Sequence, residues 1–170
     1  TAYAFSGGEL ISIDEVARHV AQYQPRYVTV TGGEPLAQPN CIGLLATLCD
    51  AGYEVSLETS GAMSVAGVDA RVVKVLDLKT PDSGEMERND FSNIALLNPQ
   101  DQVKFVLCSR ADYDWARFKL DEHQLAGRVS DVLFSPSHGQ LNPRELAQWI
   151  LQDNLPRYYP AMYTNQHHFL

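Results

Sequence analysis

The sequence lacks two features that would point to a membrane or to nucleic acid. No apolar stretch approaches the roughly 20 residues that a membrane-spanning helix requires. The 13 Lys and Arg residues are outnumbered by 21 Asp and Glu residues, which gives a net charge of -8. A protein that binds duplex nucleic acid normally presents a basic face. We therefore expect neither a membrane nor a nucleic acid among the partners, and a small molecule fits the composition better.

Cysteine is also scarce. The three cysteines, Cys41, Cys49 and Cys108, are odd in number, and their spacing matches no metal-binding motif. We expect free thiols in a reducing compartment, the cytoplasm.

The 170 residues, of which 45% are hydrophobic and 20% charged, show no repeat or linker and predict one domain over residues 1–170. The chain opens on Thr1 rather than Met, so we interpret it as part of a longer protein.

Apolar runs alternate with helical patterns along the chain. The predicted strands cover residues 26–31, 53–58, 72–78, 102–107 and 132–134. The predicted helices follow Ser12, run from Asn40 through Cys49, cover residues 111–125, and start at Asn142-Pro143. The polar segment 82–93 is interpreted as a surface loop. This alternation predicts an α/β fold with a parallel sheet, and the Val- and Leu-rich strands predict burial on both faces.

Four of the predicted strands end in small, charged or hydrogen-bonding residues. These ends are Thr31-Gly32-Gly33-Glu34, Glu58-Thr59-Ser60-Gly61, Asp77-Leu78-Lys79 and Ser135-Pro136-Ser137-His138. A tight turn explains any one of them, but it explains all four poorly. Because parallel α/β folds bind ligands at the carboxyl ends of their strands, we expect the four ends to form one site.

The residue types at these ends indicate a zwitterionic ligand, such as an amino acid or a nucleoside carrying one. Glu34 offers a carboxylate to an ammonium group, and Lys79 offers a positive charge to a carboxylate. Ser60 and Gly61 can hydrogen-bond a sugar or a carboxylate. No GxGxxG or Walker motif is present, and no serine has a nucleophile-elbow context. His138 is equally consistent with a ligand contact and with a solvated side chain.

The motif TGGEPL after a strand resembles the GGE motif of radical S-adenosylmethionine enzymes, which holds the amino-acid end of that cofactor. The segments TAYAFSGGE, ETSG, LDLKTP, DQVKFVL and LFSPSHGQL, in this order, are similar to those of the 7-carboxy-7-deazaguanine synthase family of queuosine and deazapurine biosynthesis. The resemblance covers about residues 1 to 156. It implies a shortened, modified parallel β/α barrel.

The resemblance also implies roles for the residues of the predicted site. Thr31 would contact the substrate, Gly33 the methionyl group of S-adenosylmethionine, and Glu34 its amino group. Gly32 would also belong to the cofactor-binding residues. The remaining members would line the cofactor cleft: Ser60, Gly61, Asp77, Leu78, Lys79, Ser135, Pro136, Ser137 and His138. Thr1 would bind magnesium through its hydroxyl.

The chemistry that the resemblance implies is a radical ring contraction. A 4Fe-4S cluster, reduced by a donor such as flavodoxin, would cleave S-adenosylmethionine to a 5′-deoxyadenosyl radical. The radical would take hydrogen from 6-carboxy-5,6,7,8-tetrahydropterin, which contracts to 7-carboxy-7-deazaguanine with loss of ammonia. The family forms homodimers, so we expect a cytoplasmic homodimer and a small-molecule pterin substrate.

The chain departs from the family pattern at both ends. The CxxxCxxC motif that binds the cluster is missing, because Thr1 matches the threonine just after it. We therefore expect a fragment without the first strand and the cluster loop, inactive alone. Residues 157–170 differ from the usual terminal strand, and Pro160 interrupts the run of Tyr158, Tyr159 and Tyr163. Two alternatives stay open: another radical S-adenosylmethionine protein such as an activating enzyme, and a cluster-free barrel that binds a nucleoside without catalysis.

Overall fold

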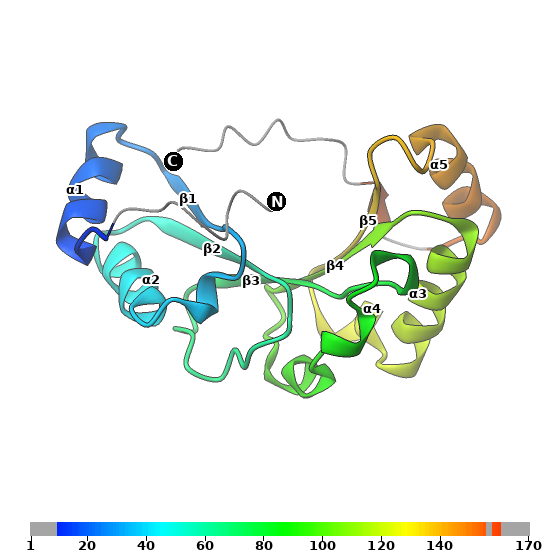
Figure 1. Cartoon of the computed structure of the whole chain (residues 1–170), viewed down its shortest axis with the longest axis horizontal. Helices are drawn as coiled ribbons and strands as arrows, with labels where there is room; N and C mark the ends of the chain where they lie inside the picture. The colour runs from blue at the N-terminus through cyan, green and yellow to red at the C-terminus, as the bar shows by residue number, and fades with distance from the viewer. Residues whose placement is uncertain (1–9, 156–157, 161–170) are drawn as a thin grey trace.

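The structure, a computed structural model, describes residues 10–155 and 158–160 and contains one parallel sheet (Figure 1). Its strands are β1 (Tyr27–Val30), β2 (Glu54–Thr59), β3 (Val73–Asp77), β4 (Gln102–Leu107), β5 (Asp131–Pro136) and β6 (Tyr158–Pro160). They lie side by side in chain order, and every neighbouring pair is parallel. Sequential parallel pairing is the arrangement of a partial β/α barrel, so the predicted fold class is confirmed.

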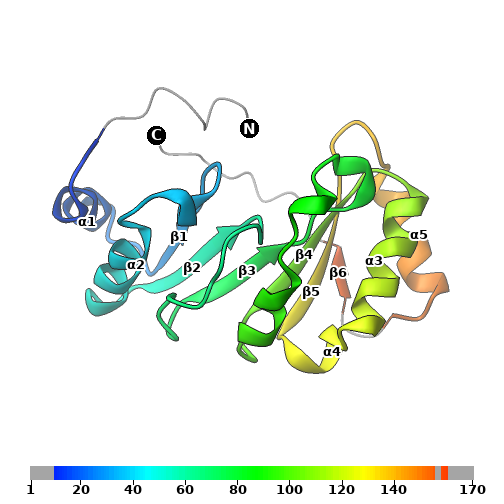
Figure 2. The same cartoon turned by 60° about the horizontal axis from the view of Figure 1, so that its bottom comes forward.

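The sixth strand lies where the sequence predicted an interrupted one. Residues Tyr158–Pro160 pair in parallel with β5, at the edge of the sheet (Figure 2). Pro160 is the last residue of the strand and is paired with Phe134 in the register. A proline is tolerated there because an edge strand can lose one backbone donor without breaking a ladder on its outer side. Tyr163 lies outside the described residues.

The described residues form five α-helices, of which the first precedes β1 and the others connect the strands. They are α1 (Ile13–Gln22), α2 (Cys41–Asp50), α3 (Arg110–Glu122), α4 (Leu125–Arg128) and α5 (Pro143–Gln152). Ser12 and Asn142 accept hydrogen bonds from the backbone N–H groups of Glu15 and Arg144, as their capping sequences predicted. Asn40 precedes α2, but its side chain makes no capping hydrogen bond.

The helix predicted over residues 111–125 is divided in the structure. Helix α3 ends at Glu122, and Gln124 has a φ of 51°, in the left-handed region. A new helix, α4, begins at Leu125, whose side chain is fully buried. The turn at Gln124 therefore lets the chain bury Leu125 before it enters β5.

The helices lie along the outer side of the sheet, where α2 contacts β2, α3 contacts β4 and α5 contacts β5 (Figure 1). Burial alternates along the strands: Val103, Phe105 and Leu107 of β4 are fully buried, whereas Lys104 is half-buried. The prediction of burial on both faces holds for β3, where Lys74, Val75 and Leu76 are all buried, but not for β2, β4 and β5. The apolar residues of β2, β4 and β5 are concentrated at alternate positions, which leaves an inner face that carries polar and charged groups.

The connection between β3 and β4, residues 78–101, is more ordered than its polarity suggested. It contains three 3₁₀ helices, η3 (Pro81–Ser83), η4 (Met86–Arg88) and η5 (Phe91–Leu96). Asn93 and Ile94 are buried, and Ile94 and Leu97 join the main core. The interpretation of residues 82–93 as a surface loop was thus only partly right, because Phe91 packs against the core and Asn93 is buried.

None of the helices within residues 10–155 and 158–160 combines the length and hydrophobicity that a membrane span needs. Cys41, Cys49 and Cys108 are free cysteines, as predicted; the first two are buried and the third is half-buried.

Candidate ligand site

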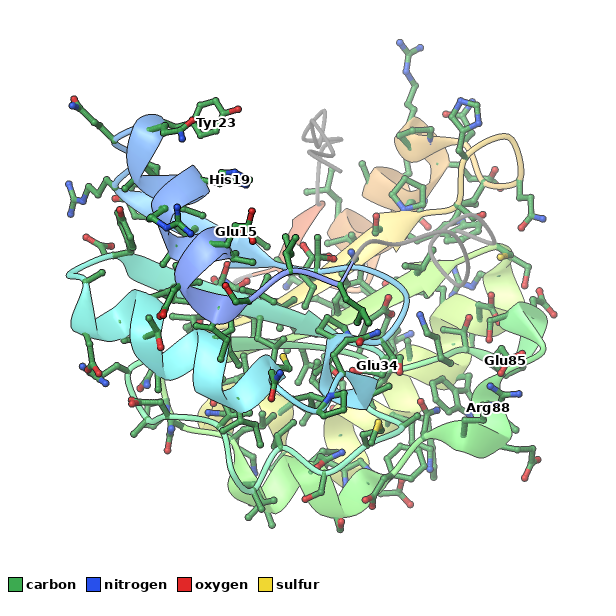
Figure 3. The ribbon with its side chains drawn as sticks, turned by 60° about the vertical axis from the view of Figure 1, so that its left-hand side comes forward. Glu15, His19, Tyr23, Glu34, Glu85 and Arg88 are labelled. Atoms are coloured by element: carbon green, nitrogen blue, oxygen red, sulfur yellow. The ribbon has the colours of Figure 1, made fainter. Side chains whose placement is uncertain are left out.

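Glu34 connects the first two strand ends through a dense set of hydrogen bonds. It lies in the loop that leaves β1, before the 3₁₀ helix η2 (Pro35–Ala37) (Figure 3). Its Oε1 accepts from the Leu36 N–H at 3.1 Å and from the Thr59 hydroxyl at 2.9 Å. Its Oε2 accepts from the Ser60 N–H at 2.9 Å and from the Ser60 hydroxyl. The GGE motif and the ETSG motif are therefore in direct contact.

The donors around Glu34 are not equivalent. The two backbone N–H groups are fixed by the main chain, and Thr59 is 2% exposed. The hydroxyl of Ser60 sits on a half-buried side chain and can rotate. An incoming ammonium group can therefore take the place of the Ser60 hydroxyl while the other three bonds hold the carboxylate in position.

Asp77 and Lys79 form an ion pair at the end of β3. The Lys79 Nζ lies 2.9 Å from Asp77 Oδ2, and the side chains are 29% and 19% exposed. The second oxygen, Asp77 Oδ1, is buried and has no hydrogen-bond partner among the described residues. Buried polar atoms normally have such a partner, so this oxygen is suited to accept a bond from a ligand.

A second ion pair lies on the inner face beside the first. Lys104 of β4 is the register partner of Asp77, and its Nζ lies 3.8 Å from Oε2 of Glu58 on β2. The inner face thus carries two carboxylates and two lysines within three adjacent strands. This balanced set matches a ligand that itself bears both charges.

Glycine is required at one position of the site for a clear steric reason. Gly61 has a φ of +73°, and a Cβ there would lie 3.1 Å from Cδ1 of Leu76. A side chain would be strained in its backbone and crowded against the core. At Gly32, by contrast, a Cβ would meet no atom of residues 10–155 and 158–160 within 4 Å, so these residues leave the space above the first strand end open.

The remaining residues predicted for the site differ in how accessible their side chains are. Leu78 is fully buried in the core, so its side chain cannot face a ligand and only its backbone is available. Ser135 and Pro136 are the last residues of β5 rather than a loop. The Ser137 N–H donates to the Leu107 carbonyl at 2.8 Å, and His138 is exposed. Thr31 is exposed beside Gly32.

Comparison with known proteins identifies the family. A curated 7-carboxy-7-deazaguanine synthase of Chlorobaculum tepidum is 44% identical over 159 residues, which cover 92% of this chain and 72% of the relative. The chain belongs to the 7-carboxy-7-deazaguanine synthase family. The synthase of Koribacter versatilis is 40% identical over 167 residues, covering 90% of this chain and 74% of that one. No family profile matches the sequence.

Solved structures of other proteins share the fold of this chain. Streptococcus suis SuiB bound to S-adenosylmethionine has a TM-score of 0.65 at 12% identity, and SuiB bound to its precursor peptide SuiA has a TM-score of 0.68 at 12% identity. Each match covers 92% of this chain but 45% and 44% of the SuiB chain, respectively. At this identity the likeness shows the fold alone.

The described site fits the functional groups of S-adenosylmethionine, which carries an ammonium, a carboxylate and two ribose hydroxyls. Glu34 offers a carboxylate with one replaceable donor, Lys79 a cation, and Asp77 Oδ1 an unused buried acceptor. No group of three or more His, Cys, Asp or Glu side chains suited to a metal occurs within residues 10–155 and 158–160, and Thr1 lies outside them.

Several residues that contribute to the site were given no individual role in the sequence analysis. Thr59 and Glu58 stand in the ETSG motif, and alternation along the strand places Glu58 on the inner face and Thr59 on the outer one. Lys104 shows the same signal, a charged residue between apolar neighbours in a strand. Asn89 and Asn93 gave no signal, because their partners lie in loops that only the fold brings near.

Proposed function

We propose that this chain forms the S-adenosylmethionine-binding part of a 7-carboxy-7-deazaguanine synthase. The complete protein would contract 6-carboxy-5,6,7,8-tetrahydropterin to 7-carboxy-7-deazaguanine with loss of ammonia. The observation that carries the proposal is the family match at 44% identity, in which the chain covers 72% of the relative. The balanced charges and the unused Asp77 Oδ1 at the strand ends support it independently.

The residues of this chain bind and orient the cofactor in this proposal. Glu34 accepts from the cofactor ammonium, which replaces the Ser60 hydroxyl, and Lys79 pairs with the cofactor carboxylate. Asp77 Oδ1 accepts from a ribose hydroxyl. Open space at Gly32 lets the methionyl group approach the backbone, with Gly33 beside it, and Thr31 contacts the substrate.

The other residues of the cleft contribute by their placement rather than by a charged group. Gly61 permits the left-handed turn after β2, where a side chain would crowd Leu76 of the core, and Leu78 contributes its backbone. The segment from Ser135 to His138 bounds the cleft from the end of β5. When bound and reduced by one electron, S-adenosylmethionine supplies the radical that removes a hydrogen atom from the substrate.

The rest of the assignment concerns the complete protein. The 4Fe-4S cluster, the flavodoxin-like electron donor, magnesium at Thr1, the homodimer and the cytoplasmic location follow from the family and stay predictions. Magnesium prefers hard oxygen ligands and often takes some from the substrate, so its binding at Thr1 should require substrate.

The test uses the full-length protein with its cluster reconstituted under anaerobic conditions. Calorimetric titration should show S-adenosylmethionine binding, and mass spectrometry should show conversion of the pterin to 7-carboxy-7-deazaguanine. Cofactor binding with turnover of a different substrate would favour another radical enzyme, such as an activating enzyme. A full-length protein that binds no S-adenosylmethionine would overturn the proposal and favour a nucleoside-binding barrel.

A further inference from the structure

Two asparagine side chains of the β3–β4 connection hold the backbones of two loops of the proposed cofactor cleft. The Asn89 Oδ1 accepts from the Lys79 N–H at 2.8 Å, and its Nδ2 donates to the Lys79 carbonyl at 2.8 Å. The amide thus pairs with both polar groups of a single residue, as a neighbouring strand would. Lys79 lies just past the end of β3, where the next residues leave the sheet.

Asn93 makes the corresponding contacts with the loop after β2. Its Nδ2 donates to the carbonyls of Gly61 at 3.1 Å and Met63 at 3.0 Å, and its Oδ1 accepts from the Val65 N–H at 3.0 Å. The side chain is fully buried, so water cannot replace these bonds. The Gly61 carbonyl also accepts from the Asp90 N–H at 3.0 Å.

The short segment from Asn89 to Asn93 therefore joins the loops that contain Gly61 and Lys79. Gly61 is in a left-handed conformation, and Lys79 carries the cation of the cleft. An amide is the side chain that suits both positions, because it places a donor and an acceptor side by side and carries no charge. An aspartate would keep the acceptor and lose the donor.

We propose that Asn89 and Asn93 are positioning residues that set the relative placement of Lys79 and Gly61 for cofactor binding. The inference rests on the proposed function, since it assigns the two loops to one ligand. The asparagines do not touch the ligand; they act through the backbone that presents Lys79 and through the turn at Gly61. Their loss should weaken cofactor affinity beyond any effect on folding.

The main experiment compares Asn89→Ala with a matched control in the full-length, cluster-loaded protein. The control is Gln100→Ala, because the Gln100 Nε2 also donates to a backbone carbonyl in a neighbouring loop, that of Ala70, at 2.8 Å. Gln100 precedes β4, at the opposite end of the sheet from Lys79. Affinity for S-adenosylmethionine is measured by calorimetry, and the melting temperature is measured on the same samples.

Asn89→Ala should raise the Kd and the KM for S-adenosylmethionine about tenfold, the size expected when a charge-assisted contact is misplaced. The KM for the pterin should stay within about twofold, because Thr31 lies on another loop. Gln100→Ala should leave both values unchanged. Asn89→Asp, which keeps the bond from the Lys79 N–H, should fall between Asn89→Ala and wild type.

Each result decides between positioning and a purely structural role. An Asn89→Ala protein with wild-type cofactor affinity and a lowered melting temperature would overturn the inference. Asn93→Ala loses three buried backbone bonds and serves as a second variant where it folds; unchanged affinity there would also count against it. If wild type itself bound no S-adenosylmethionine, the proposed function would fail rather than the positioning role alone.

Discussion

Ser60 donates both its backbone N–H and its hydroxyl to a single oxygen, Oε2, of Glu34. This contact joins residues 26 positions apart and fixes the ends of two adjacent strands to each other. The other oxygen accepts from Thr59 and Leu36, so the carboxylate has a protein donor on every side. A glutamate in this position is both a structural acceptor and, in the proposed function, the partner of an ammonium group.

Glu34→Gln should lower the free energy of unfolding by about 1.5–3 kcal/mol, because hydrogen bonds to a charged acceptor are strong and the amide would turn a donor toward one of the N–H groups. Urea denaturation monitored by circular dichroism measures the change. Glu54→Gln is the control, since Glu54 is half-exposed and pairs only across the surface with Arg26 at 2.7 Å. The control should change stability by roughly 0.5 kcal/mol or less. Equal losses in the two variants would contradict the structural role of Glu34.

Lys79→Ala should weaken S-adenosylmethionine binding in the complete protein more than it weakens folding. A charge-assisted bond to the cofactor carboxylate is worth roughly 1.5–3 kcal/mol, whereas a partly exposed pair with Asp77 contributes about 1 kcal/mol or less. Calorimetry and urea denaturation give the two numbers.

Arg71→Ala is a suitable control for Lys79→Ala. Arg71 precedes β3, at the other end of the strand from Lys79, and pairs with Asp69 at 2.7 Å and Asp50 at 2.8 Å on the surface. It should leave cofactor affinity unchanged. If Lys79→Ala lost as much stability as affinity, the lysine would be a structural partner of Asp77 instead.

The sequence predicted the strands best where their limits are set by local chemistry. Residues 102–107 form β4 as predicted, because the apolar alternation starts after Asp101 and stops at Cys108. Strand β5 is longer than predicted: Asp131 and Ser135 read as loop residues but pair with Gln102 and Val106 of β4. Pairing with a neighbour, which the sequence of one strand cannot show, decided those limits.

The site was predictable to the extent that it follows from strand ends. The parallel sheet brings Glu34 and Ser60 into contact, as the strand-end rule led us to expect. The positioning residues Asn89 and Asn93 were not predictable from the sequence. Asn93, for example, bonds to Gly61, which lies 32 residues away in the chain. Leu78 shows that a motif can also mislead: the LDLKTP motif predicted it for the site, yet its side chain belongs to the core.

A buried ion pair lies at the end of the sheet opposite to the candidate site, and the contributions of its two charges to stability should depend on each other. The Lys74 Nζ lies 2.8 Å from Asp101 Oδ2, and the two side chains are 3% and 0% exposed. Asp101 also accepts from the N–H groups of Lys74 at 2.8 Å and Asn98 at 2.7 Å. Removing Asp101 therefore leaves a buried ammonium and two backbone donors unpaired, whereas removing Lys74 leaves a carboxylate that keeps two donors.

Asp101→Ala should cost about 3–5 kcal/mol of stability, and Lys74→Met should cost less. In a double-mutant cycle by guanidinium denaturation, the double variant should lose less than the sum of the two single losses, since the second change removes the uncompensated partner. Additive losses would show that the two charges do not depend on each other.

The last prediction concerns Tyr113 of α3, a fully buried residue whose hydroxyl donates at 2.8 Å to Oδ2 of Asp153, which follows α5 and is partly exposed. Burial, and then the bond to Asp153, raise the pKa of the Tyr113 hydroxyl above its usual value. The unfolded chain ionises this tyrosine near pH 10, while the folded chain keeps the proton. The bond therefore contributes fully below about pH 10, and stability falls as the pH rises above that value.

Tyr113→Phe should lower the free energy of unfolding by about 1.5 kcal/mol at pH 8, because the carboxylate loses a donor. Its decline between about pH 10 and 11 should be shallower than that of wild type, so the two curves converge. Tyr27→Phe, which removes an exposed hydroxyl, should follow wild type throughout. Urea denaturation at half-unit steps of pH measures all three proteins, and parallel curves for wild type and Tyr113→Phe would show that Tyr113 does not govern the alkaline loss of stability.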